Sequence, residues 1–323
     1  MILLVTSKTL PTVILCVAGR IHLIYSIWCV RSLKRFGYGA IEIAVSSCRE
    51  KLFFQKYFPD VPCNVVSVNI GEYPNFSYKP FALKKYLEEI GIQHQNRDIV
   101  ICDADILWRK DPAPLFKRFS GCNWVHKITA VDPADYELEQ TEIPKSNIGL
   151  RTIRYFNDRY GIPIYPKFNL NAGLFMLPES VFPNLLDKWF EKINALPPGE
   201  MLMSEALMAL TYVELELTPT SDRSDIKYFG RHDNEVSDRL SFSLDCVDKV
   251  PGGMFSGYQT AKHYYGDQRW MLHRDAVDMG IDSDRLATEV VLRTIVRKFL
   301  RVLRSPSLLM RRLTSKLCSR ASF

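Results

Sequence analysis

Short apolar runs alternate with longer segments in which apolar residues recur every three to four positions over the first two-thirds of the chain. The short runs indicate strands and the longer spacing indicates amphipathic helices. Because the two kinds of segment follow one another, the pattern predicts an α/β fold whose mainly parallel sheet has helices on both faces. Strands are expected at 13–17, 41–45, 64–68, 99–102 and 174–177, with an edge strand at 213–217, and helices at 21–36, 49–57, 79–90, 181–193 and 200–211.

Two connections are predicted from their composition. Residues 110–112 (Lys-Asp-Pro) are typical of a turn that begins a short helix. The stretch 131–146 is polar and lacks periodicity, so we expect a long loop over the ligand-binding edge of the sheet, where substrate recognition or a lid is often found.

Two carboxylates follow the apolar run at 99–102. Asp103 and Asp105 follow it directly, and side chains two apart on an extended chain point the same way. Parallel sheets bind ligands beyond the carboxyl ends of their strands, so the pair is placed to share one cation. Carboxylate oxygens suit Mg²⁺ or Mn²⁺, which keep open positions for phosphates and water. An acidic strand end without function is the alternative reading of the tripeptide alone.

Three further segments accompany this Asp-x-Asp motif in a fixed order: 77–81 (SYKPF) before it, and 168–175 (FNLNAGLF) and 261–270 (AKHYYGDQRW) after it. In that order the chain, over about residues 13–272, resembles glycosyltransferase family 8. This family of nucleotide-sugar transferases contains the glycogenins and the lipopolysaccharide galactosyl- and glucosyltransferases. The resemblance implies a GT-A fold, with a mixed, mainly parallel sheet flanked by helices, in residues 1–285.

The resemblance also implies an activity and a set of site residues. The activity is a metal-dependent transfer of a hexose from a UDP-sugar to a saccharide or lipid-linked saccharide, with retention of anomeric configuration, and Mn²⁺ or Mg²⁺ would stabilise the leaving diphosphate. The implied metal ligands are Asp103, Asp105 and His263. The residues implied to bind the donor are Ala18, Gly19, Lys79, Asp103, Ala104, Gly173, Gly266 and Arg269.

Two residues are expected to act on the sugar itself. Asn171 would place its amide beside the transferred sugar, with Gly173 allowing close approach of the backbone. Glu205 stands, after Ser204, where many family members have an Asp-Gln pair, and it would serve as a nucleophile or as a carboxylate that stabilises an oxocarbenium-like centre. A glutamate in a first helical turn capped by Ser204 is the equally weighted alternative. Lys79 and His263 also have alternative interpretations without a functional role: Lys79 as a solvated helix residue and His263 as a structural histidine.

The sequence departs from the family pattern at two other places. Arg269 replaces the usual lysine, and Trp270 follows it without the family's intervening proline. Arg20 and His22 follow the first strand, where the family commonly has aspartate or asparagine. These departures put the loop geometry near Arg269 and the nucleotide contacts near Gly19 in question.

The cysteine content and the lengths of the apolar runs indicate the cellular compartment. Eight cysteines form no C-x-x-C pair, which favours reduced thiols and a cytoplasmic protein, and no apolar run approaches the ~20 residues of a membrane span.

Residues 286–323 contain nine Lys and Arg against one Glu, so this tail carries a formal charge of +8. The rest of the chain carries −2, which gives the total of +6. Its 286–303 pattern predicts a basic amphipathic helix, which either packs on the domain or lies peripherally on an anionic cytoplasmic membrane face. Nucleic acid is a less suitable partner, because no aromatic platform accompanies the arginines.

Two other functions compete with sugar transfer. A haloacid-dehalogenase-type phosphohydrolase also begins its site with a strand and Asp-x-Asp, but Leu107 occupies the position of that motif's Thr or Val. A non-catalytic relative that binds a nucleotide or forms a membrane scaffold is the second alternative, and the altered pair Ser204-Glu205 is the feature that supports it.

Overall fold

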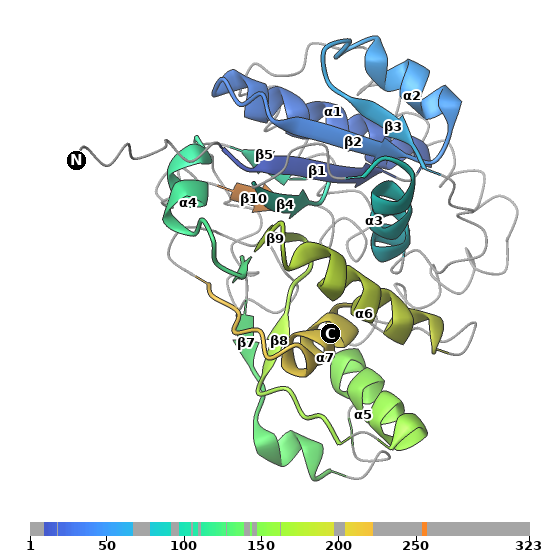
Figure 1. Ribbon diagram of the computed structural model, residues 1–323, viewed down its shortest axis with the longest axis vertical. Coiled ribbons are helices and arrows are strands. Elements are labelled where there is room, and N and C mark those ends of the chain that lie inside the picture. Colours follow the sequence, from blue (N-terminus) through green and yellow to red (C-terminus); the bar gives the residue numbers. More distant parts are fainter. Residues whose placement is uncertain are drawn as a thin grey trace, which may run out of the picture.

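A six-stranded sheet forms the centre of the computed structural model (Figure 1), in the order β3-β2-β1-β4-β9-β6. The structure describes residues 10–17, 19–66, 78–91, 97–104, 106–108, 111–126, 128–138, 143, 147–161, 163–196, 204–221 and 254–256. The strands of this sheet are β1 (Thr12–Val17), β2 (Ile41–Val45), β3 (Cys63–Val65), β4 (Asp98–Cys102), β6 (Trp124–Val125) and β9 (Leu174–Pro178).

The sheet is mixed. β3, β2, β1 and β4 run parallel, whereas β9 runs antiparallel to both β4 and β6. Two small antiparallel pairs accompany it: β5 (Ile106–Trp108) with β10 (Met254–Ser256), and β7 (Ile128–Ala130) with β8 (Phe168–Leu170). The expected mixed, mainly parallel sheet is therefore confirmed.

Helices cover both faces of the sheet because its strands are apolar on both sides. Val13, Leu15 and Val17 of β1 pack into one hydrophobic cluster, and Ile14 packs into the other, as the alternation of a strand requires. The first cluster includes α1 (Gly19–Arg35), α2 (Cys48–Gln55) and α4 (Ala113–Arg118). The second includes α3 (Tyr78–Glu89), α5 (Ile148–Tyr160), α6 (Phe182–Asn194), α7 (Ser204–Glu214) and the short 3₁₀ helix η1 (Pro133–Tyr136).

One expected element is wrong. The edge strand expected at 213–217 is instead the end of α7: Leu217 N–H donates to Tyr212 (2.8 Å) and Glu216 N–H to Val213 (3.1 Å), with Glu216 in the left-handed region at φ 53°. These two bonds form a Schellman end, in which Glu216 occupies the position usually held by glycine. The expected loop at 131–146 contains η1, whose Tyr136 is buried and donates to the Pro166 carbonyl (2.8 Å).

Within the described residues, no helix has the length and apolar character needed to cross a bilayer. The six cysteines in those residues (16, 29, 48, 63, 102 and 122) are free thiols. The tail at 286–323 lies outside the described residues, so its expected helix is not part of this description.

Candidate functional site

Strand direction brings residues that are far apart in the sequence to one edge of the sheet. β4 ends at Cys102, and antiparallel β9 begins opposite it, since Cys102 pairs with Leu174. The residues just after β4 and just before β9 therefore meet at the same edge, where Asp103 N–H donates to the Gly173 carbonyl (2.7 Å). This is the carboxyl end of the parallel strands, the edge at which such sheets bind ligands.

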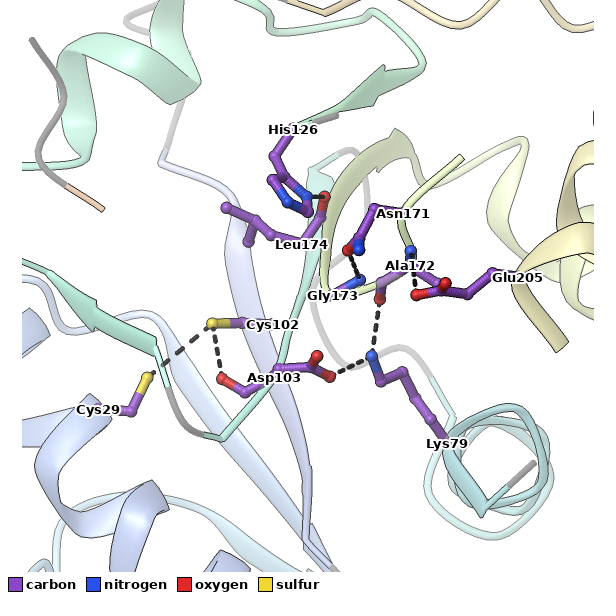
Figure 2. A network of polar contacts seen from close by, with 10 residues as sticks. All are labelled: Cys29, Lys79, Cys102, Asp103, His126, Asn171, Ala172, Gly173, Leu174 and Glu205. Carbon is purple, nitrogen blue, oxygen red and sulfur yellow. Dashed lines mark hydrogen bonds and ion pairs between the residues drawn. The ribbon is translucent and has the colours of Figure 1, made fainter. Parts of the chain in front are cut away.

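Lys79 reaches this edge from the first turn of α3 (Figure 2). Its ammonium forms an ion pair with Asp103 Oδ1 and donates to the Ala172 carbonyl (2.7 Å). Burial disfavours the charged amine, but the neighbouring Asp103 carboxylate outweighs it and raises the pKa of Lys79 above its ordinary value. The side chains of Lys79 and Asp103 are 19% and 21% exposed, so a permanent positive charge and a carboxylate lie together in a partly enclosed place.

The turn at 171–173 is held by its own side chain and lies against Asp103. Gly173 N–H donates to Asn171 Oδ1 (2.8 Å). A Cβ added to Gly173 would lie 2.8 Å from Asn171 Oδ1 and 2.9 Å from Asp103 Oδ2, closer than real Cβ contacts allow. Any larger residue here would displace one of these two polar side chains, whereas close approach of the glycine backbone to the donor stays a prediction.

Glu205 enters the site from the first turn of α7 (Figure 2). Its Oε1 accepts a hydrogen bond from Ala172 N–H (3.2 Å). Burial raises the pKa of Glu205 to about 7; the Lys79 charge lowers it, the Asp103 charge raises it, and the Ala172 hydrogen bond lowers it. Trp189 of α6 holds the first turn of α7 in place, because its Nε1–H donates to the Ser204 carbonyl (2.7 Å).

This raised pKa predicts how Glu205→Gln changes stability with pH. Between the ordinary pKa of 4.5 and about 7, the folded protein keeps a proton that the unfolded chain releases, so the free energy of unfolding falls as pH rises through this window. Glutamine does not ionise, so the free energy of unfolding of the variant does not fall with pH in this window. We expect the variant to gain about 2–3 kcal/mol on the wild type between pH 5 and pH 8 in urea unfolding with EDTA present. A difference between the two proteins that does not change with pH would contradict the assignment.

Two neighbours of the site were not expected from the sequence. The Cys16 thiol, near the end of β1, lies close enough to be influenced by the charges of Lys79 and Asp103, and burial raises its pKa to about 12. His126 is buried, and its Nδ1 lies 3.1 Å from the Leu174 carbonyl at the start of β9. Only Cys16 had a signal in the sequence, because it stands two residues before Ala18 in the segment predicted to bind the nucleotide.

Seven of the predicted site residues lie in the described part of the chain: Gly19, Lys79, Asp103, Ala104, Asn171, Gly173 and Glu205. It brings Lys79, Asp103, Asn171, Gly173 and Glu205 into one network (Figure 2). Ala104 is buried directly after Asp103, and Gly19 is the first residue of α1, after the end of β1. The other predicted residues, Ala18, Asp105, His263, Gly266 and Arg269, lie outside the described residues.

One of the three predicted metal ligands can be tested for its fit to a divalent cation. Among the described residues, no group of three or more His, Cys, Asp and Glu side chains is close enough to hold a metal; Asp105 and His263 are not among them. Asp103 itself fits, because its hard carboxylate oxygens are partly exposed at the strand end and already pair with a cation, the Lys79 ammonium.

Comparison with known proteins supports the fold. No family model matches the chain, and no curated protein matches its sequence. Among solved structures, the chain is similar to the apo bifunctional glycosyltransferase WbbM (TM-score 0.52, 14% identity, 90% of this chain and 52% of WbbM). It is also similar to the galactosyltransferase LgtC in complex with donor and acceptor sugar analogues (TM-score 0.51, 13% identity, 84% of this chain and 96% of LgtC).

The chain thus has the GT-A fold that the resemblance implied, and it spans about half the length of WbbM. This fold does not agree with the haloacid dehalogenase alternative, which rested only on a strand followed by Asp-x-Asp. At these identities the likeness establishes the arrangement of the chain, and the chemistry has to be argued from the site.

Proposed function

We propose that this protein is a glycosyltransferase that transfers a hexose from a UDP-sugar to a saccharide or lipid-linked saccharide acceptor. The observation that carries this proposal is the Lys79–Asp103 pair beside the Asn171–Gly173 turn, at the ligand-binding edge of a GT-A sheet. The pair supplies a permanent positive charge and hard oxygen ligands at one place. A nucleotide diphosphate needs both when it becomes a leaving group.

The residues of the site would divide the work of binding the donor. Asp103, with Asp105 and His263, would hold Mn²⁺ or Mg²⁺, which when bound supplies Lewis-acid stabilisation of the leaving diphosphate. The Lys79 ammonium adds a second positive charge that is already oriented by two contacts, so little reorganisation is needed as charge develops. Gly19 and Ala18 at the end of β1, and Gly266 and Arg269 of the late motif, would complete the nucleotide contacts.

On the sugar side, Asn171 would hold the transferred hexose. Its Oδ1 is engaged by Gly173 N–H, so the position of its amide group is fixed by the turn. Transfer with retention of anomeric configuration is the outcome that the family resemblance implies. An orienting amide and a bare glycine backbone suit a sugar, because hydroxyl groups need hydrogen-bond partners at close range.

A donor assay tests this proposal. Purified protein is incubated with UDP-glucose, UDP-galactose and UDP-N-acetylglucosamine, with Mn²⁺ or EDTA, and the release of UDP is measured. We expect release from one donor that depends on Mn²⁺ and increases with a suitable saccharide acceptor. If UDP binds but no donor is turned over under any of these conditions, the non-catalytic, nucleotide-binding alternative replaces sugar transfer.

The basic tail suggests where such an enzyme acts. We propose that residues 286–323 attach the protein to the anionic cytoplasmic face of a membrane, because their charge of +8 and predicted apolar stripe suit an interfacial helix. The full chain should sediment with vesicles that contain anionic lipid, and a variant ending at residue 285 should not, with its UDP affinity unchanged. Equal sedimentation of both proteins would contradict the membrane role.

A further inference from the structure

We propose that Glu205 is a positioning residue that fixes the peptide groups around Ala172, and through them the sugar-binding turn and Asp103, and that it is not a nucleophile. This inference rests on the proposed function and assigns the role of one residue within it. It is carried by the contacts that Glu205 and Lys79 make with the same buried residue.

An acidic and a basic side chain hold the two peptide groups on either side of the Ala172 Cα atom (Figure 2). Glu205 Oε1 accepts from Ala172 N–H (3.2 Å), which belongs to the peptide group before the Cα atom. Lys79 Nζ donates to the Ala172 carbonyl (2.7 Å), which belongs to the peptide group after it. Holding both groups fixes the two backbone dihedrals of Ala172, the only soft degrees of freedom at that residue. Ala172 is buried, so water cannot replace either contact without an opening of the site.

The fixed peptide groups connect directly to the groups that would bind the donor. The peptide group after Ala172 also contains Gly173 N–H, which donates to Asn171 Oδ1 (2.8 Å). The next carbonyl, that of Gly173, accepts from Asp103 N–H (2.7 Å). A rotation at Ala172 would therefore move both the amide of Asn171 and the backbone of Asp103.

Glu205 is itself held in place, as a positioning residue must be. Trp189 is 1% exposed in the core and donates from Nε1 to the Ser204 carbonyl (2.7 Å), which anchors the first turn of α7 to α6. Ser204 and Ala206, on either side of Glu205, are buried. A nucleophile has to approach the anomeric carbon with a carboxylate oxygen, whereas Glu205 directs one of its two oxygens, Oε1, to the backbone N–H of Ala172.

Two substitutions separate the roles. Glu205→Gln keeps an acceptor oxygen at the same place, and Glu205→Ala removes it; Glu191→Ala, at an exposed glutamate of α6, is the matched control. Three quantities are measured for each protein: the hydrogen-exchange rate of the Ala172 amide without ligand, the affinity for UDP with Mn²⁺, and kcat with the best donor.

A positioning role predicts rescue by the conservative variant. Glu205→Gln should keep kcat within about tenfold of the wild type, with near-normal Ala172 protection and UDP affinity, because a neutral acceptor retains most of the contact. Glu205→Ala should raise the Ala172 exchange rate and weaken UDP binding, each by about tenfold or more. If Glu205→Ala does not fold, the kcat of Glu205→Gln alone decides the question.

The opposite result would overturn the proposal. A nucleophile predicts that both variants lose about 1,000-fold or more in kcat, with Ala172 exchange and UDP affinity unchanged. Failure of the inference and failure of the proposed function can be distinguished, because exchange is measured without ligand. Absence of UDP binding by the wild type would refute the proposed function, whereas unchanged exchange in Glu205→Ala would refute the contact that carries this inference.

Discussion

Gly173→Ala is expected to weaken UDP binding in the presence of Mn²⁺ by about 100-fold or more while the protein remains folded. The new Cβ would lie 2.8 Å from Asn171 Oδ1 and 2.9 Å from Asp103 Oδ2, so both side chains must move away. These atoms are the ends of side chains, and the backbone of Gly173 is not in the left-handed region, so the surrounding strand can keep its place. The displaced groups are the proposed sugar-binding amide and metal-binding carboxylate, and function is lost for that reason.

Gly39→Ala is the matched control for this substitution. A Cβ at Gly39 meets nothing within 4 Å, and its backbone is likewise not left-handed, so stability and UDP affinity should both stay at the wild-type level. Calorimetry of UDP binding and urea unfolding are measured for both variants. If Gly173→Ala binds UDP as tightly as Gly39→Ala, the turn does not lie in the donor site.

Lys79→Met is expected to weaken UDP binding by about 10-fold to 100-fold, the range for a lost hydrogen bond from a charged donor. Methionine preserves the length of the side chain but removes the ammonium from Asp103 and from the Ala172 carbonyl. Binding of Mn²⁺ without nucleotide should not be weakened, because the Lys79 charge neutralises the carboxylate that the metal needs. The substitution should thus separate affinity for the nucleotide from affinity for the metal.

Lys85→Met provides the control on the same helix. Lys85 is an exposed residue of α3 that pairs with Glu88 three residues further along, so its loss should leave both affinities unchanged. Equal UDP affinity in Lys79→Met and Lys85→Met would show that Lys79 serves the fold and not the ligand.

The regular part of the fold could be predicted from the sequence because burial imposes a period on it. β2 was expected and found at Ile41–Val45, where all five residues are buried, and β4 and β9 were found within one residue of their expected bounds. The short strands β5 to β8 could not be predicted, since two or three residues do not establish a period.

The end of α7 shows how tertiary contacts override a local pattern. The alternation of apolar and acidic residues at 213–217 is typical of an edge strand, yet Glu214 pairs with Lys188 (3.2 Å) and with Lys192 of α6. These ion pairs and the Schellman bonds at Glu216 favour the helix over the strand. Only the position of α6 beside α7 reveals them.

The site was partly predictable for a different reason. Lys79, Asp103, Asn171, Gly173 and Glu205 were singled out by their order along the chain, and the network of contacts places them together. The role of Ala172 could not be read from its side chain, because only its backbone N–H and carbonyl take part. Such contacts depend on the pairing of β9 with β4, which the sequence does not specify.

Calorimetric titration of UDP is the measurement that tests the nucleotide-sugar site most directly. It is made on the wild type with Mn²⁺, on the wild type with EDTA, and on Asp103→Ala with Mn²⁺. The proposed site predicts that UDP binds the wild type with Mn²⁺ and that binding is lost or strongly weakened both in EDTA and in Asp103→Ala. Absence of UDP binding under all three conditions, or binding that is the same in all three, would contradict it.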